Sequence, residues 1–203
     1  MNYPVQPELS EALDDLRVFS DLTLHWTTKI NLIGSGSSSD IWERHILDSA
    51  QVFHVKQIDG GEHIDIGSGG GFPGLVIAIL NKAHKLPVAT TLIESDQRKA
   101  IFLRTVIRTL NLNARVIVDR IENVRPLSGD ILTARAVAPL PKLLGFVERH
   151  ISSHGTVLLL KGKNWQDEVR DSREIWDFSL IPHQSRTNSD SRILQIEGLA
   201  RVQ

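Results

Sequence analysis

Apolar residues are spaced differently in the two parts of the chain. In the first 56 residues they recur every three to four positions, which predicts helices over 7–30 and 41–55 with a serine-rich loop between them. From residue 63 onward, short apolar or alternating runs take turns with helical stretches. The expected strands are 63–66, 90–94, 114–118, 130–137 and 155–162, and the expected helices are 73–82, 96–111, 141–150 and 165–176.

This alternation predicts an α/β fold, with parallel strands in one sheet and helices on both of its faces. Two further strands, 177–185 and 191–199, are joined by five residues alone, and so short a connection fits an antiparallel hairpin. We therefore expect a Rossmann-like, mostly parallel sheet of the class I methyltransferase kind, closed by a C-terminal antiparallel hairpin. Residues 1–56 are expected to form an N-terminal helical extension packed on the domain 57–203, the two making one structural unit.

The composition of the chain excludes several kinds of functional site. The chain has no cysteine, which removes disulfides, cysteine-based zinc sites and thiol nucleophiles. The arrangement of the eight histidines predicts no metal site. The acidic N-terminus does not resemble a signal peptide, and the longest apolar run, near 75–80, is too short to span a bilayer. We expect a cytoplasmic protein without a membrane partner, and a monomer because extended apolar heptads are absent.

Charge is unevenly distributed along the chain. The formal net charge is −1, which argues against a dedicated high-charge nucleic-acid binder. Residues 97–125 nevertheless carry seven basic and two acidic side chains, a net of +5, whereas residues 1–30 carry a net of −3. Such a basic stretch is often a solvated helix face. Its position directly after a glycine-rich loop makes Arg98 and Lys99 candidates for RNA contacts.

The glycine-rich loop follows the first strand of the α/β part, in the segment "HIDIGSGGGFPG" (63–74). Its letters fit two motifs. Gly69, Gly71 and Gly74 match the G-x-G-x-x-G fingerprint of dinucleotide-binding folds, and Gly67, Gly69 and Gly71 match the G-x-G-x-G loop of class I methyltransferases. Either match alone is weak, so other features have to decide between them.

Three features bear on the choice between these two motifs. Pro73 removes an N–H group from the start of the following helix, which is a poor choice for cradling a pyrophosphate. Glu94 ends the second strand, where an acid binds ribose hydroxyls in both kinds of fold. The terminal hairpin discriminates best, because it is expected in the methyltransferase sheet and not in the usual dinucleotide fold. The loop is therefore predicted to hold the amino-acid end of S-adenosylmethionine.

Several blocks make the chain resemble the ribosomal RNA small subunit methyltransferase G family, also called glucose-inhibited division protein B. In family order they are "NLIGS…WERHILDSAQ" (31–51), "IDIGSGGGFPG" (64–74), "LIESDQRKAIFLR" (92–104), "DRIENV" (119–124), "TARAVAPLPKLL" (133–144) and "LLLKGKNWQDEV" (158–169). The resemblance covers most of the chain. It implies S-adenosylmethionine-dependent methylation of N7 of one guanine in 16S ribosomal RNA, with the RNA or the assembled small subunit as partner.

The resemblance also implies cofactor contacts at Gly67, Phe72, Ile121, Glu122 and Arg135. Phe72 is equally plausible as a core residue, and Glu122 as an ion-pair partner of Arg125. With the loop and the ribose carboxylate, the candidate cofactor-binding residues are Gly67, Gly69, Gly71, Phe72, Glu94, Ile121, Glu122 and Arg135. Candidate RNA-binding residues are Arg44, His45, Arg98, Lys99, Lys161 and Lys163.

The predicted reaction needs no general base, because guanine N7 carries a free lone pair and no proton. Rate enhancement is expected from alignment of nitrogen, methyl carbon and sulfur, and no catalytic residue is assigned. Two other functions stay open at this point. One is an NAD-dependent oxidoreductase on a Rossmann fold, and the other is a methyltransferase-like RNA-binding module without turnover.

Overall fold

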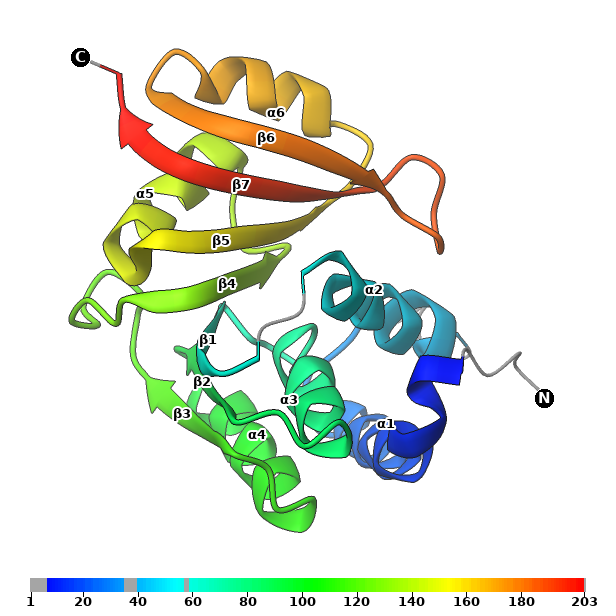
Figure 1. Ribbon diagram of the computed structural model, residues 1–203. Coiled ribbons are helices and arrows are strands. Elements are labelled where there is room, and N and C mark those ends of the chain that lie inside the picture. The colour runs from blue at the N-terminus through cyan, green and yellow to red at the C-terminus, as the bar shows by residue number, and fades with distance from the viewer. Residues whose placement is uncertain (1–6, 35–39, 57–58, 203) are drawn as a thin grey trace.

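The computed structural model describes residues 7–34, 40–56 and 59–202, and shows one seven-stranded sheet with helices on both faces (Figure 1). The strand order is β3-β2-β1-β4-β5-β7-β6. Strands β1 to β5 are parallel, and β7 pairs antiparallel with both β5 and β6. The strands are β1 (Gly61–Ile66), β2 (Val88–Glu94), β3 (Ala114–Val118), β4 (Gly129–Arg135), β5 (Ile151–Lys161), β6 (Trp176–Gln184) and β7 (Arg192–Arg201).

Helices surround this sheet and precede it. A 3₁₀ segment, Pro7–Ala12, leads into α1, and a π-helical segment, Trp42–Leu47, leads into α2. The α-helices are α1 (Leu13–Thr27), α2 (Asp48–Val55), α3 (Gly74–Ala83), α4 (Gln97–Thr109), α5 (Leu140–His150) and α6 (Trp165–Ser172). The predicted mostly parallel sheet with a terminal hairpin is confirmed.

Two predicted boundaries are wrong by four residues. Strand β5 begins at Ile151, directly after α5, and not at residue 155. The helix expected over 165–176 ends at Ser172, and Trp176 opens β6 instead. The Trp176 side chain is 2% exposed, and its indole N–H donates to the carbonyl of Pro141 at 3.1 Å. Packing beneath α5 therefore decides the conformation here, and local helical pattern does not.

Two apolar layers hold the helices to the sheet. Helices α1, α3 and α4 share one cluster, in which Leu16 and Phe19 of α1 are fully buried. Helix α5, partly covered by α6, packs on the opposite face against Ile64, Ile66 and Leu132. Helix α2 lies over β4, β5 and β7 through Val52, on the same face as α3. The N-terminal helices thus pack directly on the α/β part of the chain.

The order of strands reverses between β1 and β4, because the chain runs outward through β2 and β3 before returning to β4. Ligands of open α/β sheets bind at such a switch point, beyond the carboxyl ends of the strands. Alternation along β4 also turns Thr133 and Arg135 toward the α2 face, since side chains two positions apart share a face. None of the described helices combines the length and apolar character needed to cross a bilayer.

Candidate functional site

A first cavity of about 240 Å³ lies at the carboxyl ends of β1 to β4. Each strand contributes residues at or just beyond its end. The lining includes Gly67 after β1, Glu94 at the end of β2 and Ser95 after it, residues 119–122 after β3, Val137 and Ala138 after β4, and Lys142 and Phe146 of α5. Four of the predicted cofactor-binding residues, Gly67, Glu94, Ile121 and Glu122, therefore meet in one cavity.

Gly67 lies close to Val137, which follows β4. Its φ is +64°, and a Cβ added there would lie 2.7 Å from Cγ2 of Val137. Glycine alone adopts this backbone region without strain, and here a side chain would also meet the opposite wall. The first glycine of the motif is thus required by both conformation and space.

Glu94 ties the loop to the next strand. Its Oε2 accepts from the backbone N–H of Gly69 at 2.8 Å, and its Oε1 accepts from the N–H of Asp96 at 2.7 Å. Asp96 in turn caps α4, accepting from the N–H groups of Arg98 and Lys99. The carboxylate that was predicted to bind ribose also fixes the loop beneath it.

The segment after β3 is fixed by the end of α5. Nε of Arg149 donates to the carbonyl of Val124 at 2.9 Å, and Nε2 of His150 lies 3.3 Å from the carbonyl oxygen of Ile121. Burial lowers the pKa of His150. Glu122 pairs with Arg120 at 3.4 Å, and not with Arg125 as its alternative assignment supposed.

The prediction of no metal site did not take into account that His150 and His154 are four residues apart. Two histidines so spaced on one helix can bind zinc. In the structure α5 ends at His150 and His154 lies in β5, so the two rings do not share a helix face.

A polar network inside the sheet was not predicted. Thr133 Oγ1 donates to Asp65 Oδ1 at 2.7 Å, and Nε2 of His63 lies 2.9 Å from the same hydroxyl. Burial raises the pKa of Asp65 to about 6 and lowers that of His63 to about 3. Two polar residues at alternate positions of a central strand were the signal in the sequence that could have revealed it.

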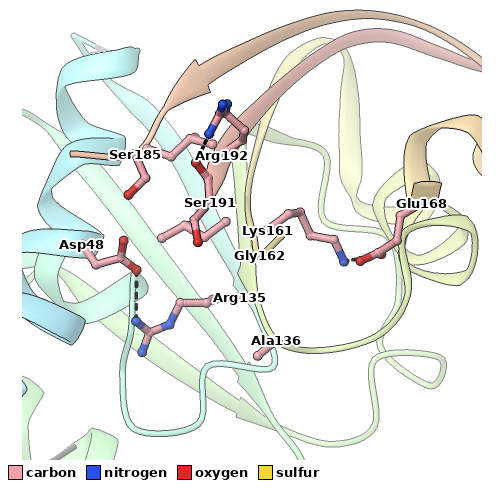
Figure 2. A pocket seen from close by; sticks show the side chains of 11 residues that line it. Asp48, Arg135, Ala136, Lys161, Gly162, Glu168, Ser185, Ser191 and Arg192 are labelled. Atoms are coloured by element: carbon pink, nitrogen blue, oxygen red, sulfur yellow. Dashed lines mark hydrogen bonds and ion pairs between the residues drawn. The ribbon is translucent and has the colours of Figure 1, made fainter. Parts of the chain in front are cut away.

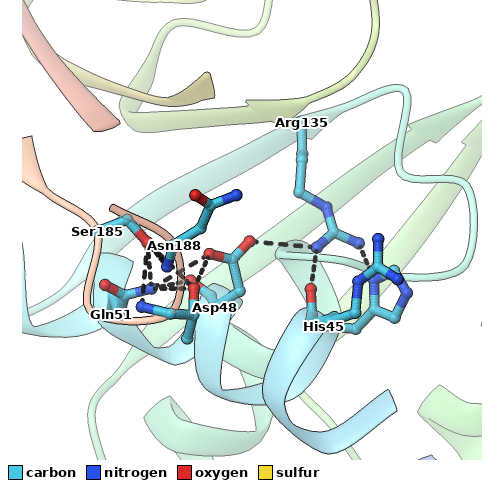
Figure 3. Close-up of polar contacts among 8 residues, drawn as sticks. His45, Asp48, Gln51, Arg135, Ser185 and Asn188 are labelled. Atoms are coloured by element: carbon cyan, nitrogen blue, oxygen red, sulfur yellow. Dashed lines mark hydrogen bonds and ion pairs between the residues drawn. The ribbon is translucent and has the colours of Figure 1, made fainter. Parts of the chain in front are cut away.

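Arg135 gathers a second group of side chains at the end of β4 (Figure 3). Its guanidinium donates to Nδ1 of His45 at 2.7 Å, to the carbonyl of Arg44 at 3.2 Å and to Oδ2 of Asp48 at 3.4 Å. Arginine has no acceptor, so His45 must accept through an unprotonated Nδ1. Burial, with the charges of Arg135 and Arg44, lowers the pKa of His45 to about 4.

Phe72 lies against this group as an apolar support. Its ring centroid is 5.0 Å from that of His45, 5.0 Å from that of Phe19 and 5.3 Å from Cζ of Arg135. The side chain is 4% exposed and belongs to the core around α1 and α3. The described first cavity is not lined by Phe72 or Arg135.

A set of hydrogen bonds joins α2 to the turn between β6 and β7; we call it the latch (Figure 3). Oδ1 of Asp48 accepts from Oγ1 of Thr187 at 2.8 Å and from Nε2 of Gln51 at 3.2 Å. Oε1 of Gln51 accepts from the backbone N–H of Arg186 at 2.6 Å. The latch therefore connects the N-terminal helices to the C-terminal hairpin.

A second cavity of about 330 Å³ lies on the other side of the β4 end (Figure 2). Its polar lining includes Asp48, Arg135, Lys161, Glu168, Ser191 and Arg192. Lys161 pairs with Glu168 at 2.6 Å and also donates to the carbonyl of Ala138, and its side chain is 9% exposed. The expectation that Lys161 contacts RNA phosphate is therefore not favoured by its surroundings.

The other predicted residues do not line either cavity. Gly71, with φ of +88°, packs under Leu75 at the start of α3. Arg98 is exposed at the start of α4 and lies 3.6 Å from Asp96, and Lys99 is half-buried beside it. Arg44 and Lys163 are exposed.

Known proteins with similar sequences are methyltransferases, the class of enzyme that was predicted. The model of a family described as rRNA small subunit methyltransferase G matches residues 12–194. Among curated relatives, the ribosomal RNA small subunit methyltransferase G of Ruegeria pomeroyi is 44% identical over 95% of this chain and 94% of its own length. The protein of that name from Paracoccus denitrificans is 43% identical over 94% of this chain and 97% of its own length.

Solved structures share the fold at low sequence identity. M. jannaschii TYW2 in complex with AdoMet aligns with a TM-score of 0.59 and 14% identity, covering 87% of this chain and 80% of that one. A TehB-like SAM-dependent methyltransferase from Corynebacterium glutamicum aligns with a TM-score of 0.59 and 12% identity, covering 90% and 99%. The sheet is that of class I methyltransferases, and the chain belongs to the rRNA small subunit methyltransferase G family.

Proposed function

We propose that this protein transfers a methyl group from S-adenosylmethionine to N7 of a guanine in small-subunit ribosomal RNA. Family membership supports the reaction and the substrate. The observation that carries the proposal is the first cavity, in which the ends of four strands meet around Gly67 and Glu94. An oxidoreductase and an RNA-binding module without turnover are not supported by the family match.

The lining of the first cavity suits an adenosyl group. The Glu94 carboxylate is placed to accept hydrogen bonds from ribose hydroxyls. Ile121 and Phe146 offer apolar surface for an adenine ring, and the bare backbone of Gly67 leaves room for close contact. S-adenosylmethionine, when bound, supplies an electrophilic methyl group on a sulfonium. Gly69, Gly71, Phe72 and Arg135 extend this proposed site along the loop toward the β4 end.

The protein's contribution to the reaction is mainly placement. Guanine N7 needs no deprotonation, so no side chain has to act as a base. The rigid loop, fixed through Glu94, would hold one reactant, and the β4 end would orient the other. Alignment of this kind accounts for a large part of many rate enhancements, up to about 7–11 kcal/mol in favourable cases.

Labelling of small subunits tests the proposal. Subunits from a strain that lacks this protein are given purified protein and methyl-labelled S-adenosylmethionine, and the digested RNA is analysed by mass spectrometry. We expect labelled 7-methylguanosine, and naked RNA run in parallel identifies the preferred form of the substrate. Binding of S-adenosylhomocysteine without any labelling of either RNA would contradict the proposed reaction.

The remaining assignments are also proposals. We propose that Arg44, His45, Arg98, Lys99 and Lys163 contribute to RNA binding. Lys163 directly follows Gly162 of the second cavity, and Arg98 and Lys99 begin the helix that follows Ser95 of the first. A cytoplasmic monomer suits an enzyme that modifies ribosomal RNA. The division into an extension, 1–56, and a domain, 57–203, is supported by the change of periodicity between them, and limited proteolysis would test it.

A further inference from the structure

The two cavities are separated by one short piece of chain. Arg135 and Ala136 line the second cavity, whereas the next two residues, Val137 and Ala138, line the first. Ala136 has φ of +55°, a conformation that is uncommon outside glycine and strained for a residue with a side chain. Such strain concentrates at functional sites, and here it accompanies the turn between the cavities. A ligand in the second cavity would thus lie next to the cofactor across a single backbone segment.

Charges in the second cavity are paired in a way that leaves two groups available (Figure 2). Lys161 is neutralised by Glu168 on one side of the cavity. Arg192 donates to the carbonyls of Ser189 and Ser191, and within the described part of the chain no carboxylate forms an ion pair with it. Its guanidinium therefore suits a phosphate.

Asp48 is the second available group. Its Oδ1 already accepts two hydrogen bonds, at 2.8 and 3.2 Å, whereas Oδ2 accepts a single long one, 3.4 Å from Nη1 of Arg135. An ionised carboxylate has about four acceptor positions, so Oδ2 retains capacity. Asp48 and Ser191 also line a third cavity of about 540 Å³, which therefore adjoins the second.

We propose that the second cavity receives the target guanine, extruded from its RNA, and that Oδ2 of Asp48 accepts from the N–H groups on its Watson–Crick edge. This inference rests on the proposed function and names the group that recognises the base. Enzymes that modify bases read an extruded base by hydrogen bonds to that edge. Guanine carries donors there, at N1 and N2, whereas adenine presents an acceptor at N1. Arg192 then faces a phosphate of the same strand.

Mononucleotide binding tests the assignment. Ligand-observed saturation-transfer NMR measures binding of guanosine and adenosine 5′-monophosphates to the protein saturated with S-adenosylhomocysteine. We expect guanosine monophosphate to bind at least about tenfold more tightly than adenosine monophosphate, as one hydrogen bond to a charged group gives. In Asp48→Asn this preference falls to within about twofold. The amide has an oxygen that can accept from guanine and an N–H group that can donate to N1 of adenine.

Thr187→Val is the matched control. It removes one hydrogen bond to Oδ1 and leaves Oδ2 unchanged, so a base-reading role predicts that the nucleotide preference survives. If Asp48 acts through the latch alone, both variants lose the preference and the inference fails. It fails as well if the wild type binds both nucleotides equally or neither at millimolar concentration, or if S-adenosylhomocysteine displaces guanosine monophosphate.

Turnover on small subunits provides a second readout. Asp48→Asn is expected to methylate at least about tenfold more slowly, with S-adenosylhomocysteine affinity within about twofold of wild type. Equal turnover would overturn the role of Asp48. Absence of labelling by the wild type would contradict the proposed function instead, so the two failures are distinct. If Asp48→Asn does not fold by circular dichroism, the wild-type nucleotide preference and the displacement experiment still decide.

Discussion

The first and second cavities adjoin the same short segment, and they are built from contacts of very different sequence separation. Around the first cavity, Glu94 reaches Gly69 across 25 positions, from one βα unit to the next. Around the second, Asp48 meets Arg135 across 87 positions and Thr187 across 139. The first cavity is therefore formed by βα units that are neighbours in the sequence. The second forms only when α2 meets the end of β4 and the turn between β6 and β7.

The largest effect is expected from a change that disrupts the first cavity alone. Gly67→Val forces a β-branched residue into φ of +64° and places its Cβ against Val137. We expect S-adenosylhomocysteine affinity to fall by at least about 100-fold in isothermal titration calorimetry. Gly60→Ala, where a Cβ would make ordinary contacts with Pro87, serves as control and should bind normally. Normal binding by Gly67→Val would show that the cofactor does not approach this glycine.

A smaller effect on the first cavity is expected from Glu94→Gln. The amide keeps one acceptor oxygen, so one of the N–H groups of Gly69 and Asp96 loses its partner, and ribose loses a charged acceptor. A lost hydrogen bond to a charged group corresponds to about 2 kcal/mol, or roughly 30-fold in affinity for S-adenosylhomocysteine. An unchanged affinity, with a lowered melting temperature, would reduce Glu94 to a structural role.

A substitution in the latch should alter the surroundings of the second cavity and leave the first cavity unchanged. Gln51→Leu leaves the N–H of Arg186 without its 2.6 Å acceptor in a site where Gln51 is 6% exposed. The free energy of unfolding should fall by about 1–3 kcal/mol in urea titrations. Exposed Gln97→Leu is the control, with little expected change. A large loss of S-adenosylhomocysteine affinity in Gln51→Leu would mean that the two cavities are not independent.

The smallest effect concerns pH and His45. Its folded pKa of about 4 lies below the unfolded value near 6.5, so the unfolded chain binds more protons between these values. The stability contributed by neutral His45 is complete above pH 6.5 and is lost as pH falls toward 4. Because the ring is partly solvated, the screened effect should be about 1 kcal/mol. Comparing wild type with His45→Asn at pH 7.5 and 5 isolates it, and equal pH slopes would contradict it.

Sequence alone supplied most of the fold and much of the first cavity, for reasons visible in particular residues. Alternating strands and helices, and a five-residue connection, determine the sheet and its hairpin. Gly67 follows β1, Glu94 ends β2, and Ile121 and Glu122 lie a few residues after β3, so parallel strands bring them together at one edge. The limit of local pattern is visible at Trp176, whose burial under α5 ends a helix early.

The latch and the second cavity could not be predicted, because their contacts join residues far apart in the sequence and leave no recognisable local pattern. Nothing near Gln51 in the sequence indicates that the backbone of Arg186 is its partner. Asp48 reads as an ordinary helical acid until Arg135 and Thr187 are placed beside it. The buried pair His63 and Asp65 was likewise treated as part of a strand, since only the register with Thr133 turns it into a network.

The latch also has a consequence for how the protein is made. Synthesis proceeds from the N-terminus, so α2 is complete long before the turn that binds it exists. A chain that stops before Ser185 would contain every residue that lines the first cavity and would lack the latch partners of Gln51 and Asp48. The same late segment supplies β7, which lies between β5 and β6, so the sheet and the latch are completed together.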